Sequence, residues 1–152
     1  MSKRHLTGIL AIAAGRGGLR SLETVLTALP EDFAVPVLVT YPRGPGVEPE
    51  LRAMLHAKLP LPVREVEDKD ELVAGAVLLA PQDYHLLVEE DGLALSLEAP
   101  VAEARPSADV LFESASDAYK ARVTAVLLAG EGEDGARGIL AVKRRGGFAV
   151  VE

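Results

Sequence analysis

The chain has 152 residues, a length typical of one domain, and 49% of them are hydrophobic although only 4% are aromatic. Its 16 basic and 23 acidic residues give a net charge of −7, which argues against nucleic acid or an anionic membrane as the partner. The absence of cysteine excludes disulfides, thiolate catalysis and cysteine-ligated zinc. No apolar run reaches the length of a membrane span, so we expect a cytoplasmic protein without membrane insertion.

The first third of the chain predicts two strands and a helix. Residues 8–14 are apolar without alternation, as in a strand covered on both faces, and we read this run as that strand rather than as a signal peptide. Residues 19–29 carry a helical stripe of leucines and valine that ends at Pro30. A second strand is expected at residues 35–40.

The middle of the chain predicts one helix, short strands and a hairpin. Asp91-Gly92 between two alternating apolar runs is typical of a hairpin turn. The expected elements are a helix at residues 48–59, strands at residues 63–66 and 76–80, a turn at residues 68–72, and hairpin strands at residues 86–89 and 93–97.

The last third returns to alternating helices and strands. The expected elements are a helix at residues 107–120 with Val110, Leu111, Ser114 and Ala118 facing inward, a strand at 123–128, a helix at 134–145 and a strand at 148–151. This alternation predicts an α/β fold, with three layers in a doubly wound and mainly parallel sheet. The hairpin is then an insertion or an antiparallel piece.

Two glycine-rich loops follow predicted strands, where α/β proteins place their chemistry. The first loop, residues 15–18, lacks the third glycine of a dinucleotide fingerprint, because Arg20 stands there. No acidic residue follows the second strand, where Thr40 to Pro42 stand, so a tight turn is the favoured interpretation. Neither loop contains Ser, Cys or His.

The second loop is acidic and offers Glu131, Glu133 and Asp134, whose oxygens could bind a hard cation. We favour a solvated loop in which Asp134 lies near a helix N-terminus, because the helix dipole stabilises an acid there. The three histidines do not cluster in the sequence, and each is expected to be structural or exposed. We therefore expect no metal and no cofactor.

Four segments resemble one known family in their order and spacing. They are residues 12–18, 78–85, 105–112 and 127–136. The most specific is the third, which reads Arg-Pro-Ser-Ala-Asp-Val-Leu-Phe, followed by the fourth with its Gly-x-Gly-x-Asp-Gly-Ala loop. The chain resembles the catalytic domain of the chemotaxis protein-glutamate methylesterases, the CheB family. The resemblance implies one methylesterase-like domain over residues 1–152, without the receiver domain that the family usually carries.

The family hydrolyses methyl esters of receptor glutamates with a Ser–His–Asp triad, and often deamidates receptor glutamines. The resemblance implies that Gly15 stands at the serine position and Pro42 at about the histidine position, while Asp134 keeps the aspartate. Glycine supplies no nucleophile and proline no proton carrier, so the family's reaction is not expected here. We therefore lean towards a protein that is not an enzyme.

The resemblance also implies a cleft beside the lost serine. Its expected lining is Arg16, Gly17, Gly18, Glu131, Gly132 and Glu133. We predict that Arg16 pairs with Glu131 or Glu133 and partly fills this cleft. The family continues beyond the last strand of this chain, so an open sheet edge near the C-terminus predicts a homodimer or another protein partner.

Three functions remain open at this point. The first is a degenerate methylesterase-like domain that binds chemoreceptor tails or other chemosensory proteins. The second is a residual or altered hydrolase that uses Asp134, Glu131 or Glu133 as acid, base or metal ligand. The third is a small-molecule sensor at the strand-end loops.

Overall fold

The computed structural model describes residues 6–42, 51–128 and 132–152. A six-stranded sheet runs through its centre in the order β3-β4-β2-β1-β7-β8, and every neighbouring pair is parallel. These strands are β1 (Ile9–Ala14), β2 (Val37–Thr40), β3 (Val63–Glu65), β4 (Val77–Leu79), β7 (Val123–Leu128) and β8 (Phe148–Val151). The predicted α/β fold with a mainly parallel sheet is confirmed.

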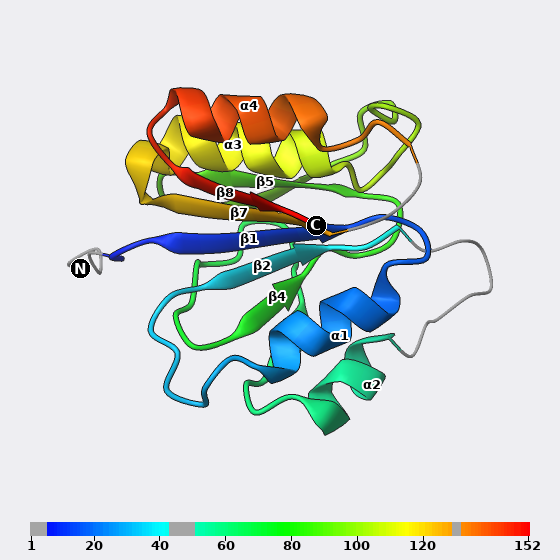
Figure 1. Ribbon diagram of the computed structural model, residues 1–152, viewed down its shortest axis with the longest axis vertical. Helices are drawn as coiled ribbons and strands as arrows, with labels where there is room; N and C mark the ends of the chain where they lie inside the picture. Colours follow the sequence, from blue (N-terminus) through cyan, green and yellow to red (C-terminus); the bar gives the residue numbers. More distant parts are fainter. Residues whose placement is uncertain (1–5, 43–50, 129–131) are drawn as a thin grey trace.

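Helices cover both faces of the sheet (Figure 1). The helices α1 (Leu19–Thr27) and α2 (Leu51–Lys58) lie on one face, and α3 (Ala108–Tyr119) and α4 (Ala136–Arg144) lie on the other. A short 3-10 helix, η1 (Lys120–Arg122), links α3 to β7. The layers form because each helix buries one apolar stripe against the sheet.

Strand β1 contributes to the core on both of its faces. Ile9, Ala11 and Ala13 belong to the apolar cluster under α3 and α4, whereas Leu10, Ile12 and Ala14 belong to the cluster under α1 and α2. All six residues of the strand are buried. This two-sided burial explains why its sequence shows no polar alternation.

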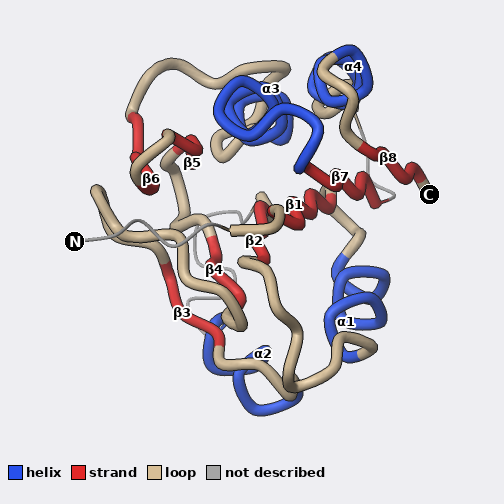
Figure 2. The backbone as a smooth tube through the Cα atoms, turned by 90° about the vertical axis from the view of Figure 1, so that its left-hand side faces the viewer, coloured by secondary structure: helices blue, strands red, loops and turns tan. Residues whose placement is uncertain are grey.

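The hairpin forms its own two-stranded antiparallel sheet, β5 (His85–Glu89) and β6 (Gly92–Ser96). It lies beside α3 and apart from the central sheet (Figure 2), and the Ser114 hydroxyl accepts a hydrogen bond from the Val88 backbone N–H at 2.9 Å. The turn is Glu90-Asp91, so placing Gly92 in the turn was wrong. Gly92 pairs with Glu89 at a φ of 153°, and a Cβ there would lie 2.6 Å from the Asp70 carbonyl oxygen.

The buried face of α3 differs from the prediction. Of the four predicted inward residues Leu111 is fully buried and Ala118 packs, partly buried, against the same core cluster. Val110 and Ser114 are only partly buried. The fully buried face includes Phe112, which packs against α4 as well as against the sheet. Its residues are Ala108, Asp109, Leu111, Phe112, Ala115 and Ser116. The predicted stripe was rotated because the sequence does not reveal that α4 lies alongside α3.

The order in which the chain adds strands to the sheet reverses direction at β1. The chain leaves β1 through α1 towards β2 on one side, and β7 enters the sheet on the other side of β1. Ligands of open α/β sheets bind at such a switch point, beyond the carboxyl ends of the strands. None of the helices in the described ranges is long and apolar enough to cross a membrane.

Candidate functional site

A cavity of about 750 Å³ opens at the switch point. Strands β1, β2 and β7 supply its floor, and the segment that leads into α3 supplies one wall. The lining residues are Ala13, Ala14, Gly15, Arg16, Thr40, Pro42, Asp83, Pro100, Ala102, Glu103, Ala104, Arg105, Pro106, Ala108, Leu127, Leu128, Gly132, Asp134, Val151 and Glu152.

The cavity gathers the three positions that the resemblance singled out. Gly15, Pro42 and Asp134 all line it, although they are far apart in the sequence. Arg16 and Gly132 of the expected cleft lining also line it. Gly17, Gly18 and Glu133 are described but do not line the cavity, and Glu131 lies outside the described residues.

The chemistry of this lining is poor in nucleophiles. Among the described residues that line the cavity, none is Ser, Cys or His, and Thr40 is the only one with a hydroxyl. Thr40 ends β2 and is buried. A threonine hydroxyl needs an adjacent base to attack a carbonyl, and this lining supplies no imidazole for that step.

The Asp134 carboxylate is bound to the start of α3. Its Oδ1 accepts hydrogen bonds from the Ser107 hydroxyl at 2.7 Å and from the Asp109 backbone N–H at 3.0 Å. Its Oδ2 accepts from the Ala108 backbone N–H at 2.6 Å. The expected position of Asp134 near a helix N-terminus is confirmed, because Asp134 directly precedes Gly135, the N-cap of α4, and binds the start of α3. The expected solvation is only partial, because Gly132 and Glu133 are exposed whereas Asp134 is half-buried.

Asp109, in α3, binds the start of α4 in the same way. Its side chain is buried, and its Oδ1 accepts hydrogen bonds from the backbone N–H groups of Gly135 at 3.0 Å and Gly138 at 2.7 Å. Asp109 was not among the predicted site residues. Its signal was the acid two residues after Ser107, a first-turn position where a carboxylate suits a helix N-terminus.

Ser107, His85 and Asp134 lie together, but they are not connected as a catalytic triad. The Ser107 hydroxyl donates to Asp134, whereas the Ser107 backbone N–H donates to His85 Nδ1 at 3.2 Å. With Nδ1 as acceptor, His85 Nε2 carries the proton and donates to the Ala99 carbonyl at 2.9 Å. Both imidazole nitrogens are thus used by the backbone. Ser107 and His85 are buried, so this cluster is structural.

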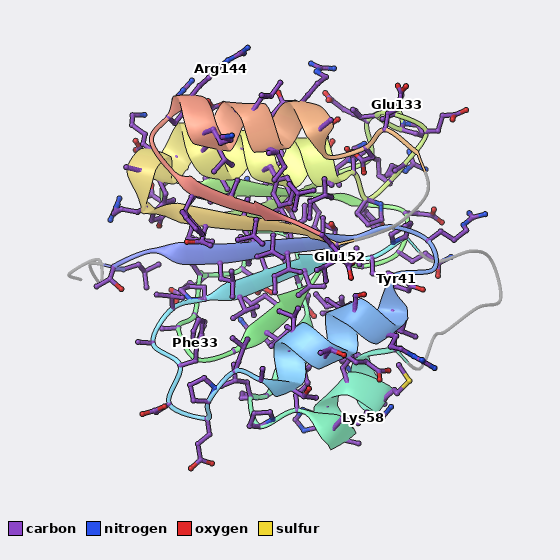
Figure 3. All side chains as sticks on the ribbon, viewed as in Figure 1. Phe33, Tyr41, Lys58, Glu133, Arg144 and Glu152 are labelled. Atoms are coloured by element: carbon purple, nitrogen blue, oxygen red, sulfur yellow. The ribbon has the colours of Figure 1, made fainter. Side chains whose placement is uncertain are left out.

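The predicted pair between Arg16 and Glu133 is not formed. Arg16 is exposed and makes no hydrogen bond or ion pair within the described ranges, and Glu133 is also exposed. Figure 3 shows Glu133 on the loop beside the α3–α4 layer, away from Glu152 at the end of β8. Pairing of Arg16 with Glu131 stays a prediction, because Glu131 is not described.

A second arginine lines the cavity from the segment before α3. Arg105 Nη1 donates to the carbonyls of Leu97 at 3.1 Å and Glu98 at 3.3 Å. Its Nε is buried without a hydrogen-bond partner. The guanidinium is therefore held in place while part of its donor capacity is unused.

The described residues contain no group of three or more His, Cys, Asp or Glu side chains arranged to hold a metal ion. Of the three acids that were candidates for binding a cation, Glu133 and Asp134 are described and Glu131 lies outside the described residues. The Asp134 oxygens already accept three hydrogen bonds.

Comparison with known proteins decides the family. A family model described as CheB methylesterase matches residues 10–152. The chain belongs to the CheB methylesterase family. A relative from Leptospira interrogans, a "Putative protein-glutamate methylesterase/protein-glutamine glutaminase", is 36% identical over 94% of this chain and 75% of its own length.

Other members of the CheB family are longer. A protein-glutamate methylesterase/protein-glutamine glutaminase from Geobacillus kaustophilus is 40% identical over 94% of this chain but only 42% of its own length. The crystal structure of the Thermotoga maritima CheB methylesterase catalytic domain superposes with a TM-score of 0.89 at 33% identity, covering 93% of this chain and 77% of that chain. The CheB catalytic-domain fold is thereby confirmed.

Proposed function

We propose that this protein is a catalytically degenerate CheB domain that acts by binding in a chemosensory pathway. The observation that carries the proposal is the composition of the cavity. Gly15, Pro42 and Asp134 meet there, and neither of the first two can replace a serine or a histidine.

The expected loss of turnover is large enough to favour binding over catalysis. Removal of the nucleophile or the base from a serine hydrolase costs on the order of a million-fold in turnover. The Asp134 carboxylate cannot compensate, because it has no imidazole to orient and its oxygens hold the start of α3. The cavity can still admit a side chain after the chemistry has gone.

The proposed partner is a chemoreceptor tail or another chemosensory protein. Relatives are named for action on protein glutamate and glutamine, so the fold's cavity is suited to a side chain of that kind presented by a protein. A volume of about 750 Å³ is ample for such a side chain and part of its neighbours.

A residual hydrolase is the second candidate, and it depends on Thr40. That hydroxyl is the only one among the described lining residues, so any hydroxyl-based hydrolysis at this cavity would use it. The substitution Thr40→Val removes the hydroxyl and nearly preserves the shape. Activity that disappeared in this variant would favour the hydrolase.

We further propose that the β8 edge associates with a second copy of the chain. Within the described sheet β8 is an outer strand, and its Phe148, Val150 and Val151 are 66%, 43% and 59% exposed. An apolar strand with an open edge is a surface that proteins commonly cover.

Binding of a chemoreceptor tail tests the main proposal. Ala104 lines the cavity, so Ala104→Trp should obstruct it, whereas Ala57→Trp places the same ring on an exposed position of α2. We expect the unmodified protein and Ala57→Trp to bind the tail fragment and Ala104→Trp to bind at least about tenfold more weakly. Absence of binding by the unmodified protein would overturn the proposal, as would equal binding by both variants.

A further inference from the structure

Two arginines reach the cavity from different parts of the chain. Arg16 follows β1, and Arg105 precedes α3. Arg16 has no hydrogen-bond or ion-pair partner within the described ranges. Arg105 is anchored through Nη1, and no described group accepts from its Nη2.

Four acids also line the cavity, but within the described residues none of them forms an ion pair with Arg16 or Arg105. Asp134 is occupied by three donors at the start of α3, and Glu152 Oε2 accepts from the Ser21 hydroxyl at 2.9 Å. Asp83 and Glu103 are exposed at the rim, where water screens their charge. Both guanidinium groups therefore keep donors that no described acid engages.

We propose that the cavity recognises a side-chain carboxylate of a partner protein, the glutamate form, in preference to the glutamine or the methyl-ester form. The inference rests on the proposed function and specifies its ligand: the protein would report the demethylated state of a glutamyl site. Arg16 and Arg105 are the specificity-determining residues.

The preference follows from the donors and from their surroundings. A guanidinium binds a carboxylate through charge-assisted hydrogen bonds about twice as strong as neutral ones. A methyl ester has no charge and presents a methyl group where the second carboxylate oxygen would lie. The floor of the cavity is apolar, with Ala13, Leu127 and Leu128, and a lower local dielectric strengthens the ionic pair.

The buried Nε of Arg105 supports this assignment. A cationic side chain with a buried, unpartnered donor is destabilised until an anion approaches it. A bound carboxylate would stabilise the whole guanidinium by charge, even without direct contact with Nε. A single carboxylate can accept from a guanidinium through both of its oxygens, so one carboxylate suits these donors.

The test compares three chemoreceptor-tail peptides that differ at one position, which holds glutamate, glutamine or glutamate γ-methyl ester. Their affinities for the full chain are measured by fluorescence anisotropy at constant salt. We expect the glutamate peptide to bind at least about tenfold more tightly than the other two. Equal affinities for all three would overturn the inference and leave the proposed function standing. Binding of none of them would overturn the proposed function as well.

Substitutions test whether Arg16 and Arg105 bind the carboxylate. Arg16→Gln removes an exposed side chain without described partners, so the fold should be retained; Arg105→Lys keeps a cation but removes the planar fork. Each should weaken the glutamate peptide about tenfold and leave the glutamine and ester peptides unchanged. Arg20→Gln is the matched control, because Arg20 is exposed on α1 and does not line the cavity. An effect of Arg20→Gln equal to that of Arg16→Gln would show a general charge effect and overturn the assignment.

Discussion

Asp134 binds the start of α3, the helix that contains Asp109, and Asp109 binds the start of α4, the helix that follows Asp134. Asp134 precedes α4 and accepts from the first residues of α3, while Asp109 in α3 accepts from Gly135 and Gly138 at the start of α4. Each carboxylate thus lies at the positive end of a neighbouring helix. The exchange joins α3 to α4 beside the cavity, and it gives Asp134 a structural role that does not depend on catalysis.

Removal of either carboxylate should destabilise the fold. Asp109→Ala leaves two backbone N–H groups without their acceptor, and we expect it to lower the free energy of unfolding by about 2–4 kcal/mol. Asp134→Ala should cost about 0.5–2 kcal/mol, the usual loss for a helix-capping side chain. Urea unfolding measures both, and the double variant should show coupling because the two residues hold one helix pair.

Asp117→Ala is the control for these variants. Asp117 lies on α3 in an exposed ion pair with Arg145, so its loss should cost no more than about 1 kcal/mol. If Asp109→Ala were no more destabilising than Asp117→Ala, the reciprocal capping would be unimportant.

His85 should prove structural. His85→Leu leaves the Ser107 N–H and the Ala99 carbonyl without their partner in a buried region, and we expect a loss of about 2–4 kcal/mol in unfolding free energy. His56→Leu is matched to it, because His56 Nδ1 accepts only one described hydrogen bond, from the Val63 N–H. We expect about 1 kcal/mol there. Equal effects of the two substitutions would contradict the role assigned to His85.

Because α3 and α4 are in close contact, any side chain at residue 138 should lower the stability of the fold. A Cβ at Gly138 would lie 2.6 Å from Phe112 Cβ and 3.1 Å from Asp109 Cα. Although alanine favours a helix, Gly138→Ala should destabilise by about 1–3 kcal/mol, because the helices must separate. Gly17→Ala serves as comparison: its Cβ meets nothing within 4 Å, so its cost comes from its φ of +90° alone. A stabilised Gly138→Ala variant in thermal unfolding would refute the tight packing.

Self-association through β8 is tested by light scattering after size-exclusion chromatography. We expect the unmodified protein to be dimeric and Phe148→Lys to be monomeric, because Phe148 is an exposed apolar residue of the edge strand. Leu97→Lys alters an exposed leucine that directly follows β6, in the hairpin that is separate from the central sheet, and should stay dimeric. A monomeric unmodified protein would rule out the homodimer.

The strands and layers were predictable because local patterns determine them. The apolar run of β1 and the Ser107 N-cap of α3 are signals contained in a few neighbouring residues. The hairpin was predictable, but its turn was not, because Gly92 is required by the approach of Asp70, about twenty residues earlier.

The site was predictable only in part. Gly15, Pro42 and Asp134 were placed together through the family resemblance, and they do line one cavity. The partners of Asp134 were missed, because Ser107 and Asp109 are distant in sequence and nothing local shows that α3 begins beside the loop. The absence of an Arg16–Glu133 pair could not be predicted either, because it depends on the conformation of an exposed loop.

Hydrolysis of a glutamyl methyl ester tests the central claim most directly. Methanol release from a methylated chemoreceptor fragment is measured with the unmodified protein, with Thr40→Val and with the double variant Gly15→Ser/Pro42→His. We predict no release above the protein-free rate for the first two, and a measurable gain in the double variant, which restores a hydroxyl and an imidazole beside Asp134. Turnover of the ester by the unmodified protein at an enzymatic rate would contradict the account.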